Sequence, residues 1–352
     1  MIDRVIDHLR VLVSHDTSDP PAVFNASHPL LAWVAQRLAD AGCAVSIDDV
    51  GGGCVNVFAT RGAPRVLWNC HLDTVPVDDK WTRDPFTLAV EGGRAIGRGT
   101  TDIKGAGACM LAAIETSDAP VAMLFTTDEE AGKGRCVEAF CASGAMAPAC
   151  AVVAEPTSCR AVTAHRGFSS YELCFTGAAG HTSQSDTGGR SAIHAAIRWG
   201  QQALDLVEGG PLAEARFNIG IVRGGVASNV IASEACVRFG MRPTPELDAE
   251  TCIAPLREAA ERLNGEWRDR FVAPPLAKRP EAVAAVQAWG IERSAPVDYW
   301  TEAALFSKAG IPSVVLGPGD IAQAHAADEF VSIAQLEMCL TFLADLTARL
   351  RR

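Results

Sequence analysis

The chain has 352 residues, of which 48% are hydrophobic and 21% are charged. This composition excludes a mainly disordered protein, and the length suggests about two domains. The net charge of −11 disfavours binding to nucleic-acid phosphates or to anionic lipid, so we expect neither nucleic acid nor a membrane as a partner.

The first half of the chain alternates between predicted helices and predicted strands. Apolar residues recur at helical spacing in 2–13, 28–41, 105–117 and 134–140. Short apolar runs predict strands at 43–48, 54–60, 65–70, 120–127 and 150–154. Apolar strands that alternate with helices are typical of an α/β layer whose sheet is covered on both faces.

The pattern changes after Pro156 and changes back near Lys278. Strand, helix, strand, strand, helix and strand follow in the order 169–177, 191–207, 216–225, 234–243, 249–263 and 266–273. This order predicts a small α+β, ferredoxin-like domain with its helices on one face of an antiparallel sheet. The chain is therefore expected to form one α/β domain from 1–164 and 274–352, with a second domain, 165–273, inserted into it.

The twelve cysteines form no C-x-x-C pair, which disfavours a zinc site made of thiolates. The first residues carry charges at Asp3, Arg4, Asp7 and Arg10, a pattern that is not typical of a secretory signal. We therefore expect reduced, buried thiols and a cytoplasmic location.

Histidines and carboxylates follow the ends of several predicted buried strands. In open α/β sheets, the ligand crevice lies at the carboxyl ends of the strands. The aspartate at 102 adds a further candidate just before a predicted helix. The candidates are His71, Asp73, Asp102, Glu129, Glu130, Glu155 and His325, with Asp128, Asp328 and Glu329 beside them in the same clusters.

Each of these residues has a simpler interpretation when it is taken alone. Asp102 would cap the following helix, Glu129 and Glu130 would form a solvated turn, and His325 would lie in an exposed loop. Together, however, imidazoles and carboxylates at one edge would repel one another without a cation. Mixed imidazole and carboxylate ligands suit zinc, and also cobalt or manganese. The set predicts a pair of divalent ions that polarises a carbonyl group and activates water.

Five motifs, in this order, carry a family resemblance: HLDTVP, GRGTTDIKG, TTDEEAG, AEPT and GPGDIAQAHAADEF. They resemble the metal-dependent aminoacyl deacylases and peptidases. The motifs GPGDIAQAHAADEF and DYWTEAALF are most similar to the acetylornithine deacetylase branch, and HRGFSS to its variants that act on N-acetyl-L-citrulline. The resemblance implies a zinc-peptidase-like catalytic domain, with a central mixed sheet flanked by helices, and an inserted lid domain.

The resemblance also implies a role for each metal-centre residue. His71 and Glu155 would hold one ion, Glu130 and His325 would hold the other, and Asp102 would bridge them. Two further residues would act beside the ions: Asp73 would support His71, and Glu129 would take a proton from water and pass it to the leaving amine.

Further site residues follow from the same resemblance. His181 in the lid would stabilise the oxyanion, and Asn229 and Arg242 would grip the substrate carboxylate. Gly317 and Gly319 would offer backbone amides near the same pocket, and Glu302 would face the substrate side chain.

The expected protein is thus a metal-dependent hydrolase, with zinc or cobalt, that removes the acetyl group from N-acetyl-L-ornithine or N-acetyl-L-citrulline in arginine biosynthesis. Its partner would be a small N-acyl amino acid, and a homodimer would form through the lid. A desuccinylase or a dipeptidase of the same family is the alternative, and a non-catalytic binding protein is a third hypothesis.

Overall fold

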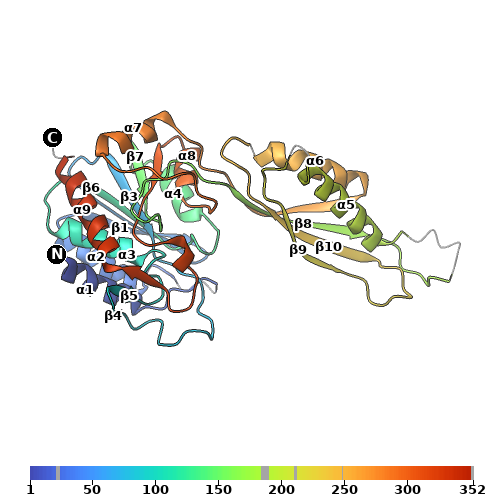
Figure 1. Cartoon of the computed structure of the whole chain (residues 1–352), viewed down its shortest axis with the longest axis horizontal. Coiled ribbons are helices and arrows are strands. Elements are labelled where there is room, and N and C mark those ends of the chain that lie inside the picture. The colour runs from blue at the N-terminus through green and yellow to red at the C-terminus, as the bar shows by residue number, and fades with distance from the viewer. Residues whose placement is uncertain (21–23, 184–189, 210–211, 248, 350–352) are drawn as a thin grey trace. The chain divides into compact units, whose positions relative to one another are not determined.

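The computed structural model describes residues 1–20, 24–183, 190–209, 212–247 and 249–349, and it separates into two compact units (Figure 1). The large unit comprises 1–163, 278–296 and 301–352, and the small unit comprises 164–277 and 297–300. The short segment 297–300 joins the small unit although it lies in the second half of the chain, which no sequence pattern indicated.

A six-stranded mixed sheet forms the centre of the large unit. Its order is β1 (Ala44–Gly51), β2 (Cys54–Arg61), β6 (Val121–Thr126), β3 (Val66–His71), β7 (Cys150–Val153) and β12 (Ser313–Val315). The last four strands in this order are parallel to one another, and β1 and β2 pair antiparallel. Every residue of β3, β6 and β7 is buried, which explains the continuous apolar runs in the sequence.

Helices cover both faces of this sheet. The helices of the large unit are α1 (Ile2–Val13), α2 (Pro29–Asp40), α3 (Lys104–Glu115), α4 (Arg135–Ser143), α7 (Pro280–Trp289), α8 (Ala303–Lys308) and α9 (Ile333–Arg349). Trp68 of β3 packs against Phe342 of α9, whereas Phe58 of β2 packs against Phe140 of α4. Trp68 and Phe58 lie on opposite faces of the sheet because side chains alternate along paired strands.

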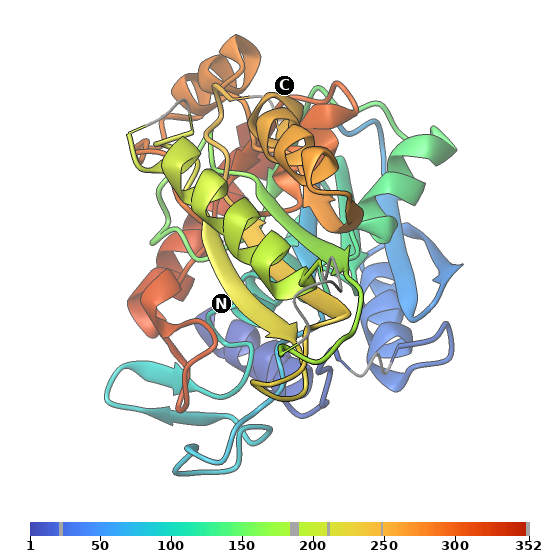
Figure 2. The same cartoon turned by 90° about the vertical axis from the view of Figure 1, so that its right-hand side faces the viewer.

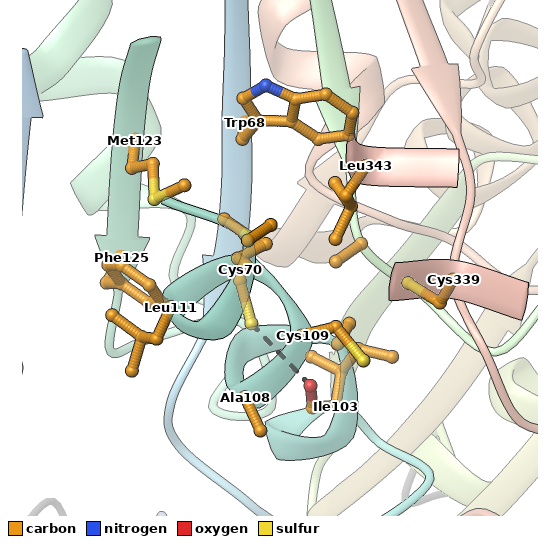
Figure 3. Packing of buried hydrophobic residues seen from close by; sticks show 14 of the residues in the cluster. Trp68, Cys70, Ile103, Ala108, Cys109, Leu111, Met123, Phe125, Cys339 and Leu343 are labelled. Atoms are coloured by element: carbon orange, nitrogen blue, oxygen red, sulfur yellow. Dashed lines mark hydrogen bonds between the residues drawn. The ribbon is translucent and has the colours of Figure 1, made fainter. Parts of the chain in front are cut away.

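The helix α3 is buried from Lys104 to Ile114, because small residues let it approach the sheet closely. A Cβ atom on Gly107 would lie 3.2 Å from the Sγ of Cys70. Figure 3 shows the residues of α3 packed between β3 and β6 on one side and α9 on the other. The tight packing fixes the start of α3, which directly follows the loop that carries Asp102.

The described residues also form two smaller sheets, one in each unit. In the large unit, β13 (Phe330–Ser332), β5 (Arg94–Ile96) and β4 (Ala89–Glu91) form a three-stranded antiparallel sheet, and η1 (Ile321–Gln323) is a short 3-10 helix. The small unit has a four-stranded antiparallel sheet in the order β11 (Gly265–Ala273), β8 (Phe168–Thr176), β10 (Glu234–Met241) and β9 (Asn218–Gly224).

Both helices of the small unit lie on one face of its sheet. Figure 2 shows α5 (Ala192–Val207) and α6 (Ala249–Arg262) along the sheet. The β8 and β10 strands alternate buried and half-buried residues, as a sheet with one covered face requires. Trp199 of α5 is fully buried against Phe239, and its indole N–H donates to the carbonyl of Leu256 at 3.0 Å.

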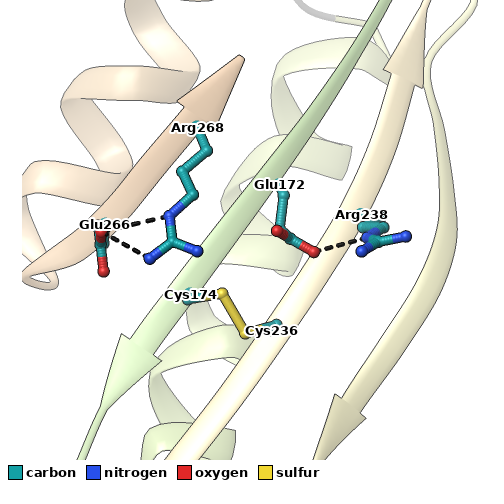
Figure 4. Close-up of a disulfide and its surroundings, with 6 residues drawn as sticks. All are labelled: Glu172, Cys174, Cys236, Arg238, Glu266 and Arg268. Carbon is teal, nitrogen blue, oxygen red and sulfur yellow. Dashed lines mark hydrogen bonds and ion pairs between the residues drawn. A yellow bond between two sulfur atoms is a disulfide. The ribbon is translucent and has the colours of Figure 1, made fainter. Parts of the chain in front are cut away.

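The other face of the small sheet carries charged pairs and a disulfide (Figure 4). Cys174 and Cys236 are direct partners in the β8–β10 register and are joined by a disulfide, whereas the other ten cysteines are not disulfide-bonded. The expectation that all thiols are reduced is therefore wrong for this pair. The reason is tertiary, because 62 residues separate the two cysteines and only strand pairing brings them together.

Among the described residues, no helix has the length and apolar character that crossing a membrane requires.

Candidate metal centre

The candidate residues meet at one edge of the large sheet. His71 is the last residue of β3, Glu129 and Glu130 follow β6, and Glu155 follows β7. These three strands are parallel neighbours, so their carboxyl ends lie at the same edge. Two further residues come from loops: Asp102 precedes α3, and His325 follows η1.

The side chains form two groups that share one carboxylate. His71, Asp102 and Glu155 make the first group, and Asp102, Glu130 and His325 make the second; within each, the candidate ligand atoms lie within 4.8 Å of one another. The Oδ1 of Asp102 lies 3.2 Å from the Nε2 of His71, and its Oδ2 lies 3.3 Å from the Nε2 of His325. Asp102 thus turns a different oxygen toward each histidine, as a bridging carboxylate does.

The ring of His71 is held with one nitrogen free for a ligand. Its Nδ1 lies 2.9 Å from the carbonyl oxygen of Asp73, which can only accept a hydrogen bond. The proton of a neutral ring is therefore on Nδ1, and the lone pair of Nε2 faces Asp102. This is the arrangement that fixes the tautomer of metal-binding histidines.

The carboxylates repel one another strongly at this edge. Burial, together with the charge of Glu155, raises the pKa of Glu129 well above its ordinary value. Burial and Asp102 also raise the pKa of both Glu130 and Glu155. Hydrogen bonds to Asp102 and Glu130 raise the pKa of His325 to about 10. The site therefore favours added positive charge, which protons or a divalent cation supply.

The residues present fit a metal ion. The Oε1 of Glu155 is buried and has no hydrogen-bond partner among the described residues. A buried carboxylate oxygen without a donor is costly unless a cation lies beside it. The set of imidazole nitrogens and carboxylate oxygens suits zinc and similar divalent ions.

Two candidates beside these groups differ in how they are held. The Oδ2 of Asp73 accepts the backbone N–H of Glu130 at 2.8 Å, so Asp73 positions a residue of each group. Among the described residues, no hydrogen bond engages the carboxylate of Glu129, although the charges of Glu155 and Glu130 act on it. An unengaged carboxylate at this place is available for proton transfer.

Three candidates in the large unit are placed differently from what the sequence suggested. Glu302 is fully buried and accepts a hydrogen bond from Thr126 Oγ1 at 2.8 Å, so it has no surface that a substrate side chain could contact. The expected backbone donors are also engaged: Gly317 N–H donates to Thr157 Oγ1 and Gly319 N–H donates to the side chain of Gln335.

These two glycines serve close packing instead. A Cβ atom on Gly317 would lie 2.6 Å from the carbonyl oxygen of Glu155. Gly319 has a φ of +96°, and a Cβ atom there would lie 2.9 Å from Thr101. Both positions require glycine because the ligand-bearing loops pass close to this segment.

The remaining candidates lie in the small unit. His181 is exposed, and its Nδ1 lies 2.6 Å from Ser183 Oγ. Asn229 is exposed, and its backbone carbonyl accepts the N–H of Thr182. The half-buried guanidinium of Arg242 stacks over the ring of Phe168 at 4.8 Å. The contacts of His181 and Arg242 orient these two side chains within their own unit.

Sequence reasoning gave no role to Glu329, which is buried beside the loop of Asp102. Its only signal was its position four residues after His325. The hydrogen bonds that define its role join segments more than two hundred residues apart, so no local pattern could show them.

Comparisons with known proteins find relatives that match nearly the whole chain. N-acetyl-L-citrulline deacetylase of Xanthomonas campestris pv. campestris is 42% identical to this chain, over 96% of the chain and 95% of that protein. Acetylornithine deacetylase of Edwardsiella ictaluri is 30% identical to this chain, over 92% of the chain and 91% of that protein.

Solved structures show the same fold at lower identity. An aminopeptidase of Bacillus cereus superposes with a TM-score of 0.78 at 17% identity, over 100% of this chain and 99% of that one. The family model of Peptidase family M20/M25/M40, whose members are metal-dependent hydrolases, matches residues 67–349. Because this match spans most of the sequence, the chain belongs to Peptidase family M20/M25/M40.

Proposed function

We propose that this protein is a cytoplasmic, metal-dependent deacetylase of N-acetyl amino acids, acting on N-acetyl-L-citrulline or N-acetyl-L-ornithine in arginine biosynthesis. The observation that carries the proposal is the pair of ligand groups that share Asp102, with the unengaged carboxylate of Glu129 beside them. The 42% identity to an N-acetyl-L-citrulline deacetylase supports the choice of substrate class.

Two divalent ions, zinc or cobalt, would be held by the two groups. His71, Asp102 and Glu155 would hold one, and Asp102, Glu130 and His325 would hold the other. When bound, such ions polarise an amide carbonyl and lower the pKa of water.

Glu129 performs the proton transfers of the reaction. It accepts the proton of the attacking water and delivers it to the amine nitrogen as the amide bond breaks. Asp73 holds His71 through its carbonyl and Glu130 through its carboxylate, which keeps one residue of each group in position.

Three residues of the small unit are proposed to bind the substrate. His181 would donate a hydrogen bond to the oxygen that becomes negatively charged when water attacks. Arg242 and Asn229 would bind the substrate carboxylate, and a guanidinium suits that planar group because it donates two parallel hydrogen bonds. The stacking of Arg242 on Phe168 limits the motion of the guanidinium before substrate arrives.

A panel of acylated substrates tests the proposed activity. With zinc or cobalt added, we expect kcat/KM to be at least about tenfold higher for N-acetyl-L-citrulline than for N-acetyl-L-ornithine, because the chain is 42% identical to an N-acetyl-L-citrulline deacetylase and 30% identical to an acetylornithine deacetylase. The panel also contains N-succinyl-diaminopimelate and a dipeptide, which represent the alternative activities. Preferred hydrolysis of either one would replace the deacetylase assignment, and a zinc-loaded protein that hydrolyses nothing in the panel would favour a binding protein.

We further propose a homodimer formed through the small unit. The strand β9 is an edge of its sheet, and its Val222 is 63% exposed. On the adjacent helix α5, Ile197 is also 63% exposed. An exposed apolar edge strand is a ready surface for pairing with a second copy.

The substitution Val222→Lys is expected to convert the dimer to a monomer, because it places a charge on the paired edge. Light scattering coupled to size-exclusion chromatography measures the mass. The matched control is Val272→Lys on the opposite edge strand β11, which is expected to leave the dimer intact. A monomeric wild-type protein, or dissociation by the control alone, would disprove this interface.

A further inference from the structure

The carboxylate of Glu329 is surrounded by N–H donors from one loop. Its Oε2 accepts hydrogen bonds from Arg98 Nη1 and from the backbone N–H of Gly99, each at 2.9 Å. Its Oε1 accepts the backbone N–H groups of Thr101 at 2.8 Å and Asp102 at 3.0 Å. The side chain of Glu329 is 1% exposed, so these bonds form away from water.

Four donors saturate the accepting positions of a carboxylate. The Arg98–Glu329 ion pair is buried on both sides, so each charge compensates the other. Hydrogen bonds to an ionised acceptor are about twice as strong as neutral ones. The backbone from Gly99 to Asp102 is therefore wrapped around this one carboxylate.

The segment that carries Glu329 also carries His325. The backbone of this segment also contacts the loop of Asp102, because the N–H of Gly97 donates a hydrogen bond to the backbone carbonyl of Glu329 at 2.9 Å. On the other side of the segment, Asp328 accepts hydrogen bonds from the N–H and the hydroxyl of Thr82, at 3.1 and 2.7 Å. The loops of His325 and Asp102 are thus joined to each other through Glu329.

We infer that Glu329 is a positioning residue that holds Asp102 between His71 and His325, and so sets the metal affinity of both groups at once. The inference rests on the proposed metal centre. The carboxylate of Glu329 belongs to neither ligand group. It acts on Asp102 through the backbone N–H of that residue and through the loop before it. Because Asp102 belongs to both groups, a shift of this loop weakens both.

The substitution Glu329→Gln separates this role from simple packing. Glutamine has nearly the same shape, but it replaces one accepting oxygen with an NH2 group that would face N–H donors. Two of the four donors lose their acceptor, and Arg98 keeps a buried charge without its partner. We therefore expect the loop from Gly99 to Asp102 to leave its position.

Two measurements on the full chain test the inference. In the first, zinc is titrated into metal-free protein by calorimetry, and Glu329→Gln is expected to weaken both binding steps by about 10- to 100-fold. In comparison, His325→Ala should weaken only the step of its own group. In the second, hydrogen exchange of metal-free protein should show faster exchange in peptides that cover residues 98–102.

Two more variants complete the design. Val286→Ala removes buried apolar volume from α7 without touching these loops, and it should leave zinc affinity and exchange at 98–102 unchanged. Glu329→Asp keeps the charge with a shorter reach, so it should show an intermediate loss of zinc affinity. If Glu329→Gln does not fold, the zinc affinity of Glu329→Asp tests the inference instead.

The inference fails if Glu329→Gln binds zinc at both steps as the wild type does, if only one step weakens, or if Val286→Ala gives the same losses. Should the wild type bind no zinc, the proposed metal centre fails instead. Exchange at 98–102 then still decides whether Glu329 positions the loop, because it is measured without metal.

Discussion

Replacing Glu129 with glutamine is expected to lower kcat on N-acetyl amino acids by about 10²- to 10⁴-fold, which corresponds to about 3 to 5 kcal/mol of activation free energy. Glutamine keeps the size of the side chain but cannot accept a proton from water. The carboxylate of Glu129 has no hydrogen-bond partner among the described residues, so its removal should leave the neighbouring structure and the bound metal unchanged. Steady-state kinetics and metal analysis of the same preparation measure both quantities.

The neighbouring substitution Glu130→Gln is the matched control, because it makes the same chemical change one residue away. The Oε1 of Glu130 lies 3.1 Å from the Nε2 of His325 within the second ligand group. We expect Glu130→Gln to lose metal, whereas Glu129→Gln keeps it. Full activity of Glu129→Gln, or loss of metal from it, would rule out the proposed role of Glu129.

The substitution Asp102→Asn is expected to reduce bound metal from about two ions per chain to one or fewer, and to lower kcat/KM by about 10³-fold or more. The reason is geometric. Each oxygen of Asp102 faces a different histidine, and an amide offers only one oxygen and no negative charge. Metal analysis after dialysis against dilute zinc measures the stoichiometry.

Two comparisons make this result specific to the bridge. Glu155→Gln changes a residue of the first group only, so it should leave the second ion bound. Asp7→Asn makes the same change on the exposed surface of α1 and should keep both ions. If Asp102→Asn retains two ions, or if Glu155→Gln loses both, Asp102 is not the shared ligand.

Much of the large unit could be predicted from local patterns. The strands β3, β6 and β7 are buried on both faces, so most of their residues are apolar and the runs are visible in the sequence. Ligand candidates stand directly after these strands, and parallel strands bring their carboxyl ends to one edge. The structure brings His71, Glu130 and Glu155 to that edge for this reason.

Other positions depended on contacts between distant segments. No local sequence pattern distinguishes a glutamate that faces the substrate from a buried one such as Glu302. In the structure, burial raises the pKa of Glu302 to about 8. The N–H groups of Gly317 and Gly319 were expected to be free, but Thr157 and Gln335 already accept their hydrogen bonds. A backbone amide near a site is available only if no neighbour satisfies it.

The sequence by itself determined the alternation of the layers, the inserted α+β pattern and the residue types of the metal centre, because periodicity and motif order are local properties of a chain. Only the tertiary structure decided that Asp102 divides its oxygens between two histidines, that Cys174 pairs with Cys236, and that Glu329 gathers the loop of Asp102. Hydrogen bonds and disulfides act over a few ångströms, and which distant segments come that close depends on the packing of the whole unit.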